Sequence, residues 1–148
     1  MDYRVEVEVN RRILLLSFQN DLTESSFMAG FFTAAAFART HPVEGVITDL
    51  SEVEKFVVSG DRVRGFVDSY PPIAPSKLRA VVAPRDDAYG IARMFQSYRQ
   101  STDTGLQVFR TMDEALKLMG LVPALAAGLA ETSAETGETP ALFAAATV

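Results

Sequence analysis

Apolar and charged residues alternate along the first stretch of the chain, from Tyr3 to Val9. This period of two predicts a strand with one buried and one exposed face. A continuous apolar run at 13–18 follows, of the length expected for a strand that is covered on both faces. The polar residues 10–12 between the two runs make a hairpin the expected connection.

Helical spacing of apolar residues then alternates with short apolar runs. Asp21 and Glu24 form a variant of the capping box, which predicts a helix that ends before Pro42. Strands are expected at 45–50, 78–83 and 106–109, and helices after Ser59, after Asp87 and after Thr111. The order is ββαβαβαβα. Strands that alternate with helices need crossover connections, so we expect an α/β fold with a mixed, mostly parallel five-stranded sheet, covering helices and one antiparallel edge from the hairpin.

Composition changes after residue 120 and divides the chain. Residues 1–120 hold all the expected elements, and 148 residues with 48% apolar content suit one domain. Residues 121–148 are rich in Ala, Thr, Glu, Gly and Pro, with Leu142 and Phe143 in one of two apolar clusters. We expect a C-terminal tail that is flexible or docked on the domain or a neighbouring copy, and the docked form would permit a homodimer.

Charge and residue types argue against several classes of function. The net charge of −5 lacks the basic surplus that binding to phosphates requires, so we expect no nucleic-acid partner. The absence of cysteine and the single histidine, His41, leave no expected metal site or cofactor, and His41 should face solvent at a helix end. No apolar run reaches the roughly 20 residues that cross a bilayer, and the N-terminus lacks a secretion signal. We expect a cytoplasmic protein without membrane insertion.

Candidate functional residues follow the carboxyl ends of the expected parallel strands, where open α/β sheets bind ligands and partners. Ser59 would stand at a helix N-terminus, which favours a phosphate or bound anion, or it would only cap the helix. Val57 and Val58 would form an exposed apolar docking patch, or belong to a strand and pack inward. The candidates for partner binding are Asp49, Ser51, Val57, Val58, Ser59, Gly60, Arg85 and Asp86.

The stretch from Gly45 to Glu54, with Asp-Leu-Ser-Glu-Val at 49–53, resembles the STAS family of anti-sigma-factor antagonists. In that family a loop then leads to Asp-Ser-Ser-Gly, where a serine is phosphorylated by the anti-sigma kinase. Here Ser59 and Gly60 match the end of this motif, and valines stand in place of its first two residues. The resemblance implies Ser59 as the candidate phosphorylation site and an anti-sigma factor or other regulator as the protein partner.

Three stretches of the second half, at 78–83, 89–95 and 108–116, look like the SpoIIAA-like branch of this family, whose members are mostly uncharacterised. The resemblance covers about residues 3–120 and implies the same α/β topology. None of the matching motifs is catalytic.

Two functions remain open from these observations. The first is a non-enzymatic regulatory module that docks on a protein partner through residues 49–67. The alternative is a carrier or sensor of a small apolar ligand or lipid, held between the sheet and the phenylalanine-rich helix at 27–37. We expect that helix to pack in a plain core, and a ligand site would appear as apolar volume that side chains leave unfilled. An enzyme would need a nucleophile, a metal set or a cofactor motif, and the sequence supplies none.

Overall fold

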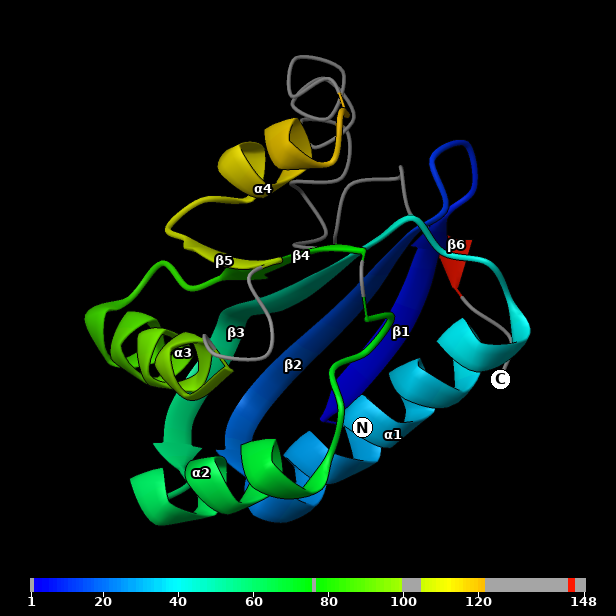
Figure 1. The fold of residues 1–148 in the computed structure, drawn as a ribbon. Coiled ribbons are helices and arrows are strands. Elements are labelled where there is room, and N and C mark those ends of the chain that lie inside the picture. The colour runs from blue at the N-terminus through cyan, green and yellow to red at the C-terminus, as the bar shows by residue number, and fades with distance from the viewer. Residues whose placement is uncertain (1, 76, 100–104, 122–143, 146–148) are drawn as a thin grey trace.

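The computed structural model describes residues 2–75, 77–99, 105–121 and 144–145 (Figure 1). The expected element order is present, with one short strand added after it. The strands are β1 (Tyr3–Glu8), β2 (Ile13–Thr23), β3 (Gly45–Val57), β4 (Leu78–Val82), β5 (Leu106–Phe109) and β6 (Ala144–Ala145). The helices are α1 (Glu24–Thr40), α2 (Gly60–Ser69), α3 (Asp86–Arg99) and α4 (Met112–Leu118).

The described strands form one sheet in the order β5-β4-β3-β2-β1-β6. Strands β2 to β5 are parallel to one another, and β1 pairs antiparallel with β2 as the predicted hairpin requires. The predicted mixed, mostly parallel α/β sheet is therefore confirmed. Strand β6 was not expected: Ala144 and Ala145 pair antiparallel with Val7 and Glu6, along the outer side of β1. The apolar pair 142–143 of the predicted tail lies outside the described residues.

Strands β2 and β3 are longer than their apolar runs predict. Strand β3 continues past Leu50 to Val57, and β2 continues past Phe18 to Thr23, with register shifts on either side of Asn20. Many residues of these extensions are polar and exposed, so burial does not mark them in the sequence. The two strands hold each other through parallel pairing along the extension.

The longer β2 also moves the start of α1. Thr23 is the N-cap, and its hydroxyl accepts a hydrogen bond from the backbone N–H of Ser26 at 3.1 Å. The Ser26 hydroxyl accepts one from the Thr23 N–H at 3.0 Å, which completes a capping box. The predicted box of Asp21 and Glu24 is wrong, because Asp21 still belongs to β2.

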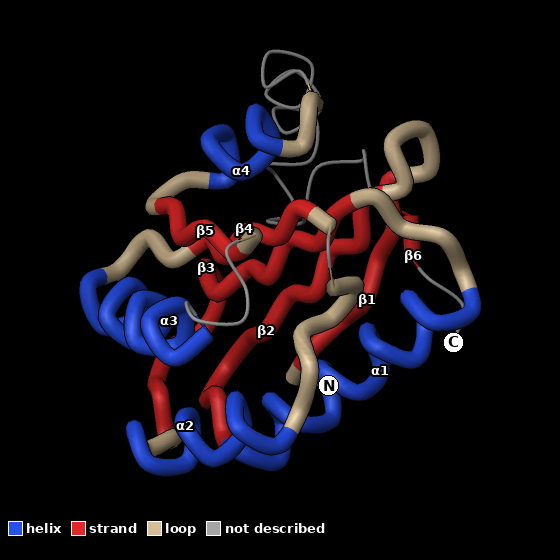
Figure 2. Tube along the Cα trace, in the orientation of Figure 1, coloured by secondary structure: helices blue, strands red, loops and turns tan. Residues whose placement is uncertain are grey.

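The helices cover the two faces of the sheet unequally (Figure 2): α1, α2 and α3 lie on one face and α4 lies on the other. Successive strand residues point to opposite faces. Leu14 and Leu16 accordingly pack under α1 to α3, whereas Ile13 and Leu15 pack under α4. The apolar run of β2 is thus covered on both sides, as predicted.

Candidate functional site

Three of the predicted site residues, Asp49, Ser51 and Val57, lie within β3 and not in a loop. The Asp49 carboxylate accepts hydrogen bonds from the backbone N–H and the hydroxyl of Ser51. Val57 is the last residue of the strand and is 53% exposed, while Val58 is half-buried and lines a cavity. The predicted loop after Leu50 is therefore wrong, and the two valines take different environments.

Ser59 is the N-cap of α2. Its hydroxyl accepts a hydrogen bond from the backbone N–H of Arg62 at 3.2 Å, and Gly60 is the first helical residue. This is the capping geometry that the simpler interpretation of Ser59 predicts. The Arg62 guanidinium also lies 3.6 Å from the carboxylate of Glu24, so an ion pair joins the starts of α1 and α2.

Arg85 and Asp86 hold the start of α3 in place. The Arg85 guanidinium donates to both carboxylate oxygens of Asp87, at 3.1 and 2.9 Å, and to the backbone carbonyl of Glu54 in β3 at 2.9 Å. The hydrogen bond from Arg85 lowers the pKa of the Asp87 carboxyl below its ordinary value. Asp86 pairs with Arg110 at 2.8 Å. Both candidates make contacts that tie neighbouring elements together.

His41 lies where the sequence places it, exposed at the end of α1. Its ring stacks on Phe37 with 4.2 Å between centroids, and its Nδ1 lies 2.9 Å from the Thr40 hydroxyl. Across the described ranges, no three His, Asp or Glu side chains are grouped so that they could hold a metal ion. In the same part of the chain, no helix is long and apolar enough to span a membrane.

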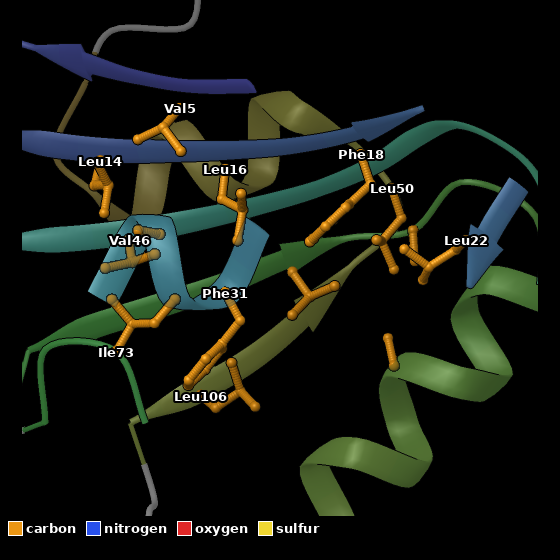
Figure 3. Close-up of a cluster of buried hydrophobic side chains, with 14 of the residues drawn as sticks. Val5, Leu14, Leu16, Phe18, Leu22, Phe31, Val46, Leu50, Ile73 and Leu106 are labelled. Atoms are coloured by element: carbon orange, nitrogen blue, oxygen red, sulfur yellow. The ribbon is translucent and has the colours of Figure 1, made fainter. Parts of the chain in front are cut away.

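A cavity of about 410 Å³ lies between the sheet and helices α1, α2 and α3. This volume is within the roughly 300–1,000 Å³ typical of small-molecule sites. Side chains from the strands and from α1 converge on this side of the sheet, among them Leu16, Val46 and Phe31 (Figure 3). The expected plain core is therefore incomplete, because apolar volume is left unfilled where the phenylalanine-rich helix meets the sheet.

Aromatic rings from all three helices form the helical wall of the cavity. The Phe66 ring of α2 lies 4.8 Å from Phe27 and 4.7 Å from Phe31, both in α1, measured between centroids. Both of these contacts are edge-to-face. Phe95 of α3 lies 6.3 Å from Phe66 and from Phe27. Rings packed against one another in this way brace the helices.

Two buried arginines also line the cavity, and neither is among the candidate residues predicted from the sequence. Arg79 of β4 is 6% exposed and its Nε donates to the Lys77 carbonyl at 3.2 Å. Arg99, the last residue of α3, is 3% exposed and donates to the Tyr70 carbonyl at 2.7 Å. Periodicity could have found them. Arg79 shares a strand face with Val81, and Arg99 follows Phe95 by four residues on one helix face.

The opposite end of the cavity is lined by exposed polar residues at the starts of α1 and α2. These are Glu24, Asp61 and Arg62. Gly65 of α2 is also exposed and lines the cavity, and a Cβ added there would meet nothing within 4 Å. The cavity thus reaches the surface along α2. Its charged lining residues are unevenly distributed: the buried ones, Arg79 and Arg99, are cationic, and both acidic ones are exposed.

Comparison with known proteins returned no matching family model and no matching curated protein. Among solved structures, the chain is similar to one described as "Structure of the Anti-Sigma Factor Antagonist SpoIIAA in its Unphosphorylated Form". The two share 16% sequence identity and a TM-score of 0.48, over 81% of this chain and 98% of that chain.

Proposed function

We propose that this chain is a non-enzymatic regulatory module that binds a small apolar ligand between its sheet and helices α1 to α3. The observation that carries the proposal is the cavity of about 410 Å³ in what would otherwise be the main core. Protein interiors are packed to the density of organic crystals, with few voids larger than a water molecule. An apolar cavity of this size favours an apolar guest, since burying the guest's surface removes it from water.

Docking on a protein partner is the second candidate, favoured by the exposure of Val57 at the end of β3. The proposed docking segment at 49–67 includes Val63 and Phe66, which line the cavity from α2. A ligand in the cavity would touch the helix that presents the docking surface, so binding and docking would be coupled. A phosphate on Ser59, mapped by mass spectrometry in protein from its native host, would support the switch that the family resemblance implies.

The ligand site is tested by titrating the purified chain with octanol, a neutral apolar probe, and following binding by calorimetry and by methyl NMR. We expect saturable binding with chemical-shift changes centred on residues that line the cavity. Bound octanol should also raise the melting temperature, because a ligand that binds only the folded state stabilises it.

Two glycines provide matched variants for this titration. Gly65 and Gly90 are both exposed helical residues at which an added Cβ meets nothing within 4 Å, but only Gly65 lines the cavity. Gly65→Leu should weaken octanol binding severalfold, whereas Gly90→Leu should bind like the wild type. No saturable binding by the wild type, or equal weakening by both variants, would contradict the proposed site.

A further inference from the structure

We propose that the ligand is an amphiphile of the fatty-acid type, whose carboxylate binds at Arg99 and Arg79 while its chain occupies the apolar part of the cavity. This inference rests on the proposed function, because it adds a head group to the apolar ligand. The ligand is identified only by its chemistry: one anionic head and one short apolar chain.

Both arginines belong to the same end of the cavity. Arg79 is near the start of β4, where its backbone pairs with Leu106 at the start of β5. The Leu106 carbonyl accepts a hydrogen bond from Gln96, one turn before Arg99 in α3, at 2.9 Å. Arg99 itself reaches the carbonyl of Tyr70, the C-cap of α2. The starts of two strands and the ends of two helices therefore place Arg79 and Arg99 on neighbouring elements at the same end of the cavity.

Burial gives these cations an influence that surface arginines lack. Charges interact more strongly where water is excluded, because the effective dielectric constant is lower. A guanidinium group is planar and carries five N–H donors, a geometry that suits a carboxylate better than a hydroxyl or an ammonium group. An anionic head would thus be favoured at Arg79 and Arg99, and a cationic head would be repelled.

The remaining lining provides the apolar part of the site. Between the buried arginines and the polar rim, the wall carries the phenylalanine rings of α1, α2 and α3. The acidic lining residues, Glu24 and Asp61, lie at the starts of α1 and α2, whereas the end of α2 is tied to Arg99. A fatty acid with its head at the arginines would keep its carboxylate away from these like charges.

The alternative is that the two arginines act only as structural ties. Arg99 already bonds the carbonyl at the C-cap of α2, and a basic group near a helix C-terminus is stabilising in itself. In that case the cavity would accept octanol and octanoic acid equally well. The two roles therefore differ in the ligand preference of the folded protein.

The test compares octanoic acid, octanol and octylamine on the wild-type chain by calorimetry at neutral pH. Octanoate should bind about tenfold or more tightly than octanol, as expected for a hydrogen-bonded charged group, and octylamine most weakly. Equal binding of acid and alcohol would overturn the anionic head and leave the apolar site intact. If none of the three binds, the proposed function itself fails.

Variants then assign the preference to residues. Arg99→Gln and Arg79→Gln should each lose most of the advantage of octanoate while keeping the affinity for octanol, a result that a purely structural tie would not produce. Arg93→Gln, at an exposed residue of α3 that does not line the cavity, is the control and should keep the preference. Retention of the full preference in both buried-site variants would overturn the assignment. The wild-type probe series decides the head-group chemistry even if a variant fails to fold.

Discussion

The two faces of the sheet show two different ways of covering strands. On one face the seven-residue helix α4 lies against β2, β3 and β4, with Ala115 and Leu116 almost fully buried against Leu15 and Ile47. On the other face three longer helices meet through their phenylalanine rings, and a cavity remains between them and the strands. The face covered by three helices is therefore less completely filled than the face covered by one.

Side-chain size accounts for much of this contrast. Alanine at position 115 lets α4 approach the strands closely, so small neighbours such as Ala80 complete the contact. On the cavity face, the edge-to-face contacts of Phe66 with Phe27 and Phe31 run from helix to helix. Rings engaged in this way hold the helices to one another and leave part of the strand surface uncovered. A face that stays partly unfilled at a cost in stability is where we expect a ligand.

The largest expected effect comes from truncating adjacent leucines that point to opposite faces. Leu15 and Leu16 are both at most 1% exposed, but only Leu16 borders the cavity. Leu15→Ala should lower the free energy of unfolding by about 4 kcal/mol, and Leu16→Ala by about 2 kcal/mol, because Leu16 has fewer packing partners to lose. Urea unfolding of the two variants beside the wild type measures both values.

Equal losses for the two leucines would break the comparison, since they would mean that both faces are packed alike. Repeating the unfolding measurements in saturating octanol gives a second comparison of the two faces. Octanol should stabilise Leu15→Ala as much as the wild type, because that variant keeps the same cavity, and stabilise Leu16→Ala more, because its enlarged cavity takes up more of the probe.

A smaller effect is expected at the helix caps of the two faces. Ser59 begins α2 on the cavity face and Thr111 begins α4 on the other, each accepting a hydrogen bond from a backbone N–H three residues later, at 3.2 and 3.3 Å. Ser59→Ala and Thr111→Ala should each cost about 1 kcal/mol of unfolding free energy. Thermal and urea denaturation give these values.

The affinity for octanol should distinguish the two cap variants. Only Ser59→Ala should weaken it, since α2 forms a wall of the cavity. Ser59→Asp should retain the stability of the wild type, because aspartate is also a good N-cap. A loss of octanol binding in Thr111→Ala of the same size would show that the two faces are not independent.

The smallest effect concerns the ion pair at the start of α3. Arg85→Ala should raise the pKa of the Asp87 carboxyl toward its ordinary value, because the hydrogen bond from Arg85 is the largest cause of its lowering. A carboxyl whose pKa is lowered by folding stabilises the fold above its unfolded pKa, and this stabilisation is lost as the pH falls through the folded value. The variant should therefore lose less stability on acidification.

An NMR pH titration of the Asp87 carboxyl carbon measures this shift. Arg110→Ala is the control, because Arg110 pairs with Asp86 and is not among the groups that shift the pKa of the Asp87 carboxyl. An unchanged Asp87 pKa in Arg85→Ala would show that the observed hydrogen bonds do not persist in solution.

The order of elements could be predicted from the sequence because each strand and helix has an apolar face with its own period. The lengths of β2 and β3 could not, since the residues from Ser51 to Lys55 are mostly polar and are held by pairing between strands. Strand β6 was missed for a related reason. Alanine has a low preference for strands, so nothing in the local sequence marks Ala144 and Ala145. They form a strand because they pair with the edge of β1.

The sequence offered the space between the sheet and the helix at 27–37 as a possible ligand site, but it could not decide whether a cavity is present there. Phe27, Phe31 and Phe66 have the spacing of core residues, and that spacing is the same whether the space beside them is filled or empty. Filling depends on the angles at which the rings meet, which are tertiary features. Arg79 and Arg99 do not follow the carboxyl end of a strand, where charged site residues are expected; they belong to β4 and α3 and face inward by periodicity.

Strand β6 has a consequence for the order in which the chain is made. The residues that pair with β1 come at positions 144 and 145, after every other strand and helix that the structure describes. During synthesis, the backbone N–H and C=O groups of Glu6 and Val7 at the outer edge of β1 therefore lack their strand partner while the other strands of the sheet are translated and assembled. The charged residues that alternate through β1 are the kind that discourage a nascent strand from pairing with a neighbouring polypeptide during this interval.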